Sequence, residues 1–225
     1  MEDRITPGLY LELGDLDPAH YARSRVPELL ATPGVDRVSW WRTVVPGRDE
    51  LPMAIPDGTL LGVAETGDRF LAPAPLAGTT ARHFHRYPRP GQGILTGRPT
   101  TGLLVVWISP LTPELAQSLR DWADFIHIST IAAAAVPGYT QISAYENAAD
   151  TDPRFMHFYE MDSDDPEATY QTMAEDLRVR LGGYHTPQFK QWANWTKAGA
   201  RIVYVNTFRL LGSSGTPAVA GRGRT

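Results

Sequence analysis

His127 is the best single candidate for proton transfer in this sequence. His127 follows Trp122 by five residues in a segment of helical spacing. It lies roughly 100° around the helix axis from the apolar centre marked by Leu119 and Ile126. An imidazole with its ordinary pKa near 6.5 exchanges protons close to neutral pH. We therefore predict that His127 is a general acid or base, with Trp122 beside the substrate; a solvent-facing histidine is the alternative.

Polar residues on predicted strands form a second set of candidates. Glu12 lies in an alternating strand, and a carboxylate on the inner face of a strand needs a partner or a role. Aligning the strand ends places Tyr10 and Glu12 on the same cavity-lining surface as Trp107. Simple core packing is the alternative for the aromatic members. We predict two roles: catalysis for Glu12 and Tyr159, and substrate binding for Tyr10, Trp107, His157, Tyr204 and Asn206.

A pair of histidines, His83 and His85, is separated by one residue on a predicted strand. Side chains at this spacing share one face, so both imidazoles could reach one ion. No acidic or cysteine ligand is near, and Arg82 and Arg86 flank the pair with positive charge. We therefore predict no metal site and assign both histidines to substrate binding, with a structural role as the alternative.

The elements that position these residues follow from periodicity and breakers. Alternating apolar residues predict strands, and Asp17-Pro18 and Thr112-Pro113 each combine an N-cap with a proline in the first helical turn. Pro33-Gly34 stops the first helix. The first unit is predicted as strand 9–13, helix 18–32, strands 35–44 and 59–65, a degraded helix in 68–79, and strand 81–87.

The second unit is more complete. It is predicted as strand 102–109, a helix from 113, strands 139–146 and 154–161, a helix from 166, an aromatic-rich loop around Trp192 and Trp195, and strand 201–210. Proline and glycine mark the linker between the units. The predicted organisation is a first unit over 1–90, a linker over 91–101, a second unit over 102–211, and a disordered tail over 212–225.

The two units share the pattern strand, helix, Pro-Gly, strand, about 100 residues apart. A repeat of this length indicates a duplicated domain, because solenoid repeats have periods of about 20–50 residues. The element order βαββαβ of the second unit is the ferredoxin-like arrangement. We predict an α+β protein in which two ferredoxin-like repeats place their antiparallel sheets face to face and form one pseudo-dimeric barrel.

The helix segments also resemble a known family. Trp122, His127 and the following Pro137-Gly138-Tyr139 resemble the W-Y-D-x-x-H-x-P…x-P-G-F segment of EthD-like proteins, which belong to the dimeric α+β-barrel superfamily. The first unit resembles the same segment, with Arg25 where the histidine would stand. The resemblance covers most of 8–66 and 102–210. The chain departs from the family in carrying two units and in having two extra residues between His127 and Pro137.

This resemblance implies a small-molecule barrel. The superfamily hosts cyclases, isomerases, cofactor-free monooxygenases and haem enzymes such as chlorite dismutase. Arg25 would then bind an anionic oxygen or stabilise an enolate, with an ion-paired arginine as the alternative. We expect a cofactor-free acid–base enzyme of the lyase, isomerase or cyclase type, acting on a small, largely apolar carbonyl or hydroxy compound, with one site per chain. A haem protein with an axial histidine (His127, His157 or His185) and a non-catalytic binding barrel are the alternatives.

Composition sets the remaining expectations. The net charge of −4 and the pI of about 5.9 argue against a nucleic-acid-binding surface. The polar N-terminus and the absence of a long apolar run argue against a signal peptide and a membrane span. With no cysteine there is no thiol nucleophile and no cysteine-ligated metal. We therefore expect a cytoplasmic protein whose partner is a small molecule; whether it also forms a homodimer is left open.

Overall fold

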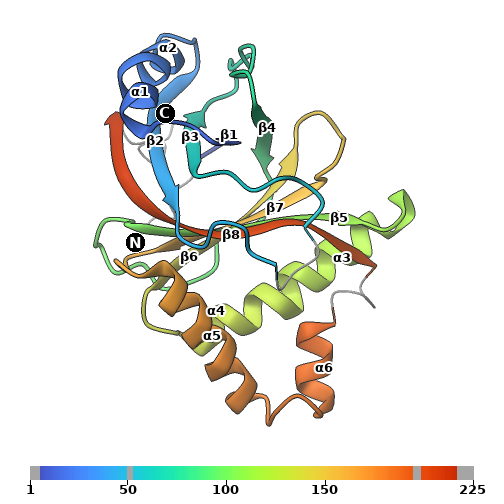
Figure 1. The fold of residues 1–225 in the computed structure, drawn as a ribbon. Coiled ribbons are helices and arrows are strands. Elements are labelled where there is room, and N and C mark those ends of the chain that lie inside the picture. Colours follow the sequence, from blue (N-terminus) through green and yellow to red (C-terminus); the bar gives the residue numbers. More distant parts are fainter. Residues whose placement is uncertain (1–5, 50–52, 195–198, 217–225) are drawn as a thin grey trace, which may run out of the picture.

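Eight antiparallel strands close into a barrel in the computed structural model, which describes residues 6–49, 53–194 and 199–216 (Figure 1). The order around the barrel is β1-β3-β2-β8-β5-β7-β6-β4. The strands are β1 (Gly8–Gly14), β2 (Val35–Thr43), β3 (Leu60–Thr66), β4 (Thr79–Arg86), β5 (Gly102–Pro110), β6 (Tyr139–Asn147), β7 (Phe155–Met161) and β8 (Ala200–Gly215). The predicted antiparallel α+β barrel is therefore confirmed.

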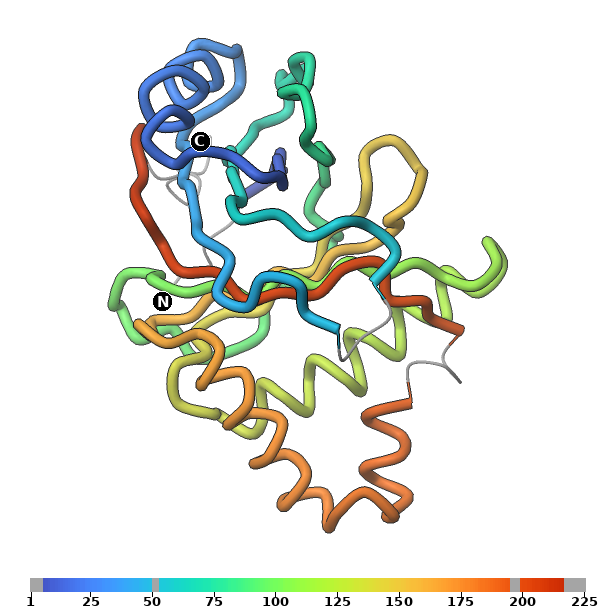
Figure 2. Tube along the Cα trace, viewed as in Figure 1, coloured from blue at the N-terminus to red at the C-terminus, as the bar shows by residue number. Residues whose placement is uncertain are grey.

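The strands divide into a first half, β1–β4, and a second half, β5–β8, with the same internal order. In each half the fourth strand pairs with the first, the first with the third, and the third with the second. Pairing of β2 with β8 and of β4 with β6 joins the halves. β8, red in Figure 2, runs from the helices of the second half to the helical end of the first half.

The helices lie outside the barrel, on opposite sides (Figure 1). The first half carries one continuous helix, and the second half carries a longer one followed by two more. Asp17 caps the first by accepting a hydrogen bond from the His20 amide at 2.6 Å. The segments are α1 (Pro18–His20), π-helical η1 (Tyr21–Arg25) and α2 (Val26–Leu30); 3₁₀ η2 (Pro113–Leu115), α3 (Ala116–Trp122), π-helical η3 (Ala123–Ile128) and α4 (Ser129–Ala134); α5 (Pro166–Arg180); and α6 (Pro187–Ala193).

Strand alternation separates an inner core from two outer ones. Leu9, Leu11 and Leu13 face the barrel interior, where they pack with apolar side chains of both halves. The residues between them face the first helix, where Tyr10 packs with Tyr21. On the second half the outward residues of β5 and β7 pack beneath α3 to α6. The barrel thus has a filled interior and a helix–sheet layer on each side.

Three segments differ from the sequence-based expectation. Residues 67–78 contain no helix. The tail predicted to begin at residue 212 is wrong for its first four residues, because β8 continues to Gly215 and pairs with β2. Gly212 permits this, since a Cβ there would lie 2.4 Å from the Trp40 ring. The predicted aromatic loop is helix α6, capped by Thr186. Trp195 and residues 217–225 lie outside the described residues.

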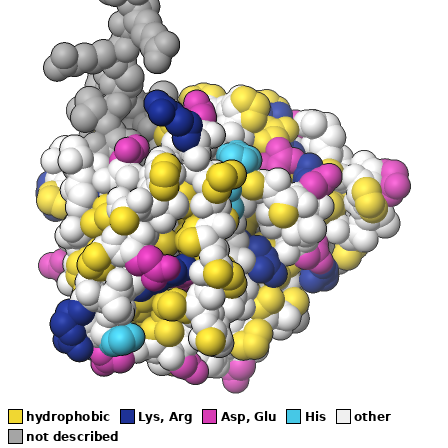
Figure 3. Space-filling model, turned by 90° about the horizontal axis from the view of Figure 1, so that it is seen from above, with side chains coloured by type: hydrophobic (Ala, Val, Ile, Leu, Met, Phe, Trp, Pro, Cys, Tyr) yellow, Lys and Arg dark blue, Asp and Glu magenta, His cyan; other side chains and the backbone are white. Residues whose placement is uncertain are grey.

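Two surface properties complete the description. Within the described residues, no helix has the length and apolarity needed to cross a bilayer. On the face shown in Figure 3, basic and acidic side chains are interspersed with apolar ones.

Candidate functional site

The residues predicted to share one site lie in three separate places. Glu12, Tyr10 and Arg25 meet in the helix–sheet layer of the first half, where His83 and His85 on β4 adjoin Tyr10. Trp107, Tyr204 and Asn206 belong to the barrel interior and its end. The third group lies in the helix–sheet layer of the second half: Trp122, His127, His157 and Tyr159.

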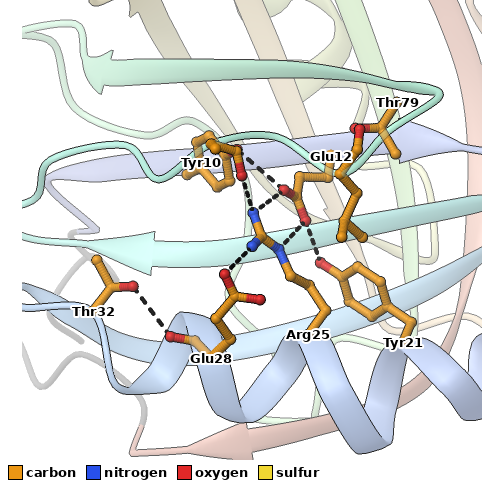
Figure 4. A network of polar contacts seen from close by, with 9 residues as sticks. Tyr10, Glu12, Tyr21, Arg25, Glu28, Thr32 and Thr79 are labelled. Carbon is orange, nitrogen blue, oxygen red and sulfur yellow. Dashed lines mark hydrogen bonds and ion pairs between the residues drawn. The ribbon is translucent and has the colours of Figure 1, made fainter.

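In the first half, Glu12 is the centre of a buried polar network (Figure 4). Its carboxylate accepts hydrogen bonds from Tyr10 and Tyr21, each at 3.1 Å. Arg25 donates to it twice, at 2.5 and 3.1 Å, and also donates to Ala74 O at 2.9 Å. Burial, together with the neighbouring Glu12 charge, raises the pKa of both tyrosines. Every polar side chain in this network is hydrogen-bonded to another group of the protein, as is typical of a structural cluster.

This geometry corrects the prediction that Tyr10 and Glu12 line the barrel interior. The leucines of β1 occupy that face, so the alternate residues point outward toward η1. Arg25 accordingly binds a protein carboxylate, as its ion-paired alternative anticipated.

The barrel interior is filled with side chains, which corrects the prediction of a cavity there. Trp107 has no exposed surface and contacts Tyr204 with 5.4 Å between ring centroids. The hydroxyl of Tyr204 and the amide of Asn206 donate to Asp57, at 2.6 and 3.0 Å. The opening at the Leu9–Trp41 end holds only ≈ 40 Å³. Both polar groups predicted to face a substrate are therefore used within the fold.

His83 and His85 do share one face, with ring centroids 4.7 Å apart. His83 packs against Phe70 and lies 3.2 Å from the Thr66 hydroxyl. Burial, together with the charge of His85, lowers the pKa of His83 to about 4. Among the described residues no group of three metal-ligating side chains occurs. His83 is the cross-strand partner of Tyr10, and Phe70 contacts both rings, so the pair borders the layer that holds Glu12 and Arg25.

The layer of the second half is where the remaining candidates converge. Val106, in the middle of β5, pairs across the sheet with His157 on β7, so both side chains face the helices. Val106 is partly exposed although Gly102–Val105 and Trp107–Ser109 are buried. Part of the Val106 side chain is therefore left uncovered beside His157. We call the region around these two side chains, in the layer that also holds Trp122, His127 and Trp192, the central recess.

His157 is held by a buried ion pair. Nε2 of His157 lies 2.9 Å from Nη2 of Arg120, and the same guanidinium donates twice to Asp124. Arg120 has no exposed surface and lies over the Tyr87 and Phe155 rings. Burial, with the nearby charges of Arg120 and His127, lowers the pKa of His157 well below its ordinary value. His157 is therefore neutral at pH 7.

His127 lies between two indole rings. Trp192 stacks on it at 5.1 Å with an interplanar angle of 8°, and Trp122 lies at 5.0 Å on a 33° tilt. Nδ1 of His127 donates to the Trp192 carbonyl at 3.1 Å, and the Trp192 indole donates back to the His127 carbonyl. Burial lowers the pKa of His127 to about 4. The imidazole is thus a neutral base at pH 7, weaker than its ordinary pKa implied.

Two tyrosines extend the polar lining along the sheet. Tyr159 follows His157 on the same face of β7, with ring centroids 6.4 Å apart, and Tyr139 lies 5.9 Å beyond it. The Tyr139 hydroxyl is buried and has no hydrogen-bond partner in the described part of the chain. Burial raises the pKa of both phenols, so both stay protonated and can donate.

An apolar pocket adjoins this layer at the C-terminal end of α4. It has a volume of ≈ 160 Å³ and is lined mainly by Ile131, Ala132, Val136, Tyr139 and Ile142. A dry cavity of about this size holds one benzene ring. The second half thus combines space for a small ring with the Tyr139 hydroxyl, which has no hydrogen-bond partner among the described residues.

Arg120 and Asp124 were missed by the sequence-based prediction, which matched Arg25 with His127. The sequence feature that could have identified Arg120 is its distance from the start of its helix. Arg25 and Arg120 each stand seven residues after the first proline of their helix, Pro18 and Pro113. Both are buried against the sheet through a strand residue.

Comparison of the structure with solved structures gives matches over nearly the whole chain. An anthrone oxidase-like protein aligns with a TM-score of 0.56 at 13% identity, covering 96% of each chain. A candidate monooxygenase from Fusobacterium nucleatum aligns with a TM-score of 0.52 at 9% identity, covering 94% of this chain and 95% of the other. A candidate chlorite dismutase aligns with a TM-score of 0.50 at 12% identity, covering 92% and 96%.

The fold is that of the dimeric α+β barrels. Here one chain supplies all eight strands of the barrel. No protein-family model matches the sequence, and no curated protein matches it. The likeness to EthD-like proteins in particular stays a prediction.

A haem does not fit the histidines as they stand. A porphyrin ligated by Nε2 of His127 would lie across the imidazole plane, in space that the two flanking indoles occupy. Nε2 of His157 is occupied by Arg120, and His185 is exposed. Haem binding at any of these positions therefore requires that other side chains move.

Proposed function

We propose that this protein is a small-molecule enzyme that removes a proton from a flat, enolisable carbonyl or hydroxy compound bound in the central recess. The observation that carries the proposal is His127, a neutral imidazole packed between two indoles at the edge of the recess. One of its nitrogens is used by the Trp192 carbonyl and the other is free among the described residues. In this proposal the catalytic groups are side chains of the chain itself.

The weak basicity of His127 limits the substrates to compounds with a relatively acidic C–H or O–H group. A base whose conjugate acid has a pKa of about 4 removes protons only where the resulting anion is itself well stabilised. An enolate conjugated with an aromatic ring meets this condition, and N–H or O–H donors at its oxygen stabilise it further. His157 and Tyr159 lie on β7 as neutral groups able to donate.

Such an anion is the common intermediate of isomerisation, cyclisation and reaction with dioxygen. The names of similar structures, an anthrone oxidase-like protein and a candidate monooxygenase, make the third outcome a specific second candidate. In each case His127 performs the same first step: the C–H or O–H bond breaks, its proton goes to Nε2, and the electron pair stays on the substrate.

We further infer that the two halves are fused copies of one ferredoxin-like unit, supported by their identical strand order. The first copy has lost its second helix and buries its polar groups against one another. One working site per chain, in the second half, follows from that divergence.

Hydrogen–deuterium exchange tests the proton step without requiring oxidation. Anthrone is incubated with protein in D₂O without oxygen, and loss of its methylene signal is followed by proton NMR. We expect faster exchange with the protein, and a loss of about 10²–10⁴-fold in His127→Asn. Exchange by His127→Asn within a few-fold of the parent would remove His127 from its role. Admission of air then shows whether the anion is oxidised.

A further inference from the structure

The hydrogen bonds of the two recess histidines fix where each carries its proton. A carbonyl oxygen only accepts, so Nδ1 of His127, 3.1 Å from Trp192 O, must donate. A guanidinium only donates, so Nε2 of His157, 2.9 Å from Arg120, must accept. Both rings are neutral, so both carry the proton on Nδ1. The two histidines therefore have the same tautomer.

The free nitrogens are nevertheless of opposite kind. The Nδ1–H of His127 is hydrogen-bonded to the Trp192 carbonyl, which leaves the Nε2 lone pair available to a ligand. The Nε2 lone pair of His157 is hydrogen-bonded to Arg120, which leaves the Nδ1–H available to a ligand. Within the described ranges neither free nitrogen has a hydrogen-bond partner. Both imidazoles belong to one helix–sheet layer: Arg120 holds His157, and His127 follows Arg120 by seven residues, about two turns, along the same continuous helix.

We propose that this donor–acceptor pair makes the site specific for a hydroxyl conjugated with an aromatic ring or a double bond, that is, a phenol or an enol. The inference rests on the proposed function. Nε2 of His127 accepts the hydroxyl proton while Nδ1–H of His157 donates to the hydroxyl oxygen. On transfer the O–H bond breaks, the proton binds Nε2, and the electron pair stays on oxygen beside the His157 N–H. Arg120 is a positioning residue that fixes the tautomer of His157.

Other ligand classes match this pair less well. A carboxylate brings no proton for Nε2 and directs an anion at its lone pair. A methyl ether can accept from His157 but cannot donate to His127. An aliphatic alcohol can make both hydrogen bonds but is not flat, whereas the indoles beside His127 offer planar faces.

Binding of a matched pair of probes tests the inference. Affinities for 2-naphthol and 2-methoxynaphthalene are measured by fluorescence titration of the full chain at pH 7. Loss of one neutral hydrogen bond and crowding by the methyl group predict about 10-fold or greater preference for the naphthol. Equal affinities would overturn the donor–acceptor pair while leaving the recess as a binding site. Binding of neither probe would overturn the proposed function as well.

Asparagine and glutamine separate the two ring nitrogens, because their amides occupy the places of Nδ1 and Nε2 respectively. His127→Asn keeps the donor to Trp192 and removes the free lone pair, and His157→Gln keeps the acceptor for Arg120 and removes the free N–H. Each should abolish the preference for naphthol. His127→Gln and His157→Asn are the matched controls. They keep the substrate-facing group and should retain at least part of the preference for naphthol. Preference unchanged in both His127→Asn and His157→Gln would overturn the pair.

The tautomers can also be read directly. Nitrogen-15 NMR of histidine-labelled protein should show Nδ1–H for both residues, and Arg120→Lys should perturb His157 while leaving His127 unchanged. An Nε2–H signal for either histidine in the parent protein would contradict the assignment.

Discussion

Replacement of Glu12 by glutamine distinguishes a structural role for this residue from the catalytic one that its strand position first indicated. The carboxylate has no exposed surface and accepts four hydrogen bonds, two of them from Arg25. In Glu12→Gln, the guanidinium is still buried, at 3% exposure, but loses its buried counter-charge. Among the described residues, Glu28, at 58% exposure, is then its one remaining ion-pair partner. Removal of one partner from a buried pair costs about 3–5 kcal/mol.

Urea unfolding followed by circular dichroism measures this cost. We expect the midpoint of Glu12→Gln to fall by an amount equivalent to about 3–5 kcal/mol, with an unchanged slope. Glu28→Gln removes the exposed partner of the same arginine and is the matched control, with an expected cost of about 0–1 kcal/mol. The double variant Glu12→Gln/Arg25→Met removes both charges and should recover most of the loss.

Two results would refute this reasoning. One is a Glu12→Gln variant within 1 kcal/mol of the parent, roughly the cost of an exposed pair. The other is a folded Glu12→Gln variant that loses anthrone exchange as fully as His127→Asn, which would return Glu12 to the catalytic set.

Three further outcomes are expected. Gly62→Ala should destabilise the fold by about 1–3 kcal/mol, because its Cβ would lie 1.9 Å from the Tyr21 hydroxyl; Gly67→Ala, with its nearest atom at 3.9 Å, should change stability by less than about 0.5 kcal/mol in chemical denaturation. Because the pKa of His127 falls from 6.5 to about 4 on folding, the unfolded chain binds more protons between these values. Stability should therefore decrease as pH falls through that window, and His127→Asn should flatten the slope; an unchanged slope would argue against the buried neutral ring. Leu11→Ala in the filled interior should cost about 2–5 kcal/mol and leave naphthol affinity unchanged, whereas a large affinity change would place the ligand inside the barrel.

The antiparallel barrel could be predicted because its strands alternate cleanly. Leu9, Leu11 and Leu13 repeat with a period of two, and the stop at Pro33-Gly34 separates the first helix from the next strand. Which face would be the interior could not be predicted in the same way. Aligning Tyr10 and Glu12 with Trp107 was wrong by one residue, and a shift of one residue exchanges the two faces of a strand.

The site could be predicted only in part, because the burial of its residues depends on tertiary contacts. Trp122 and His127 were chosen from one helix and His157 and Tyr159 from one strand, and the structure places all four in one layer. Arg120 was overlooked because it is a charged residue on a helix, and such residues are usually exposed. Its burial depends on a tertiary contact with β7, which the local pattern does not contain.

The central claim is that ligand binds between the helices and the sheet of the second half, outside the barrel. The six tryptophans provide probes for it. Protein labelled with 5-fluorotryptophan, its fluorine resonances assigned by single Trp→Phe variants, is titrated with 2-naphthol. The account predicts that the resonances of Trp122 and Trp192, beside His127, move, while that of Trp107, inside the barrel, stays fixed. Movement of Trp107 with Trp122 and Trp192 unchanged would contradict it.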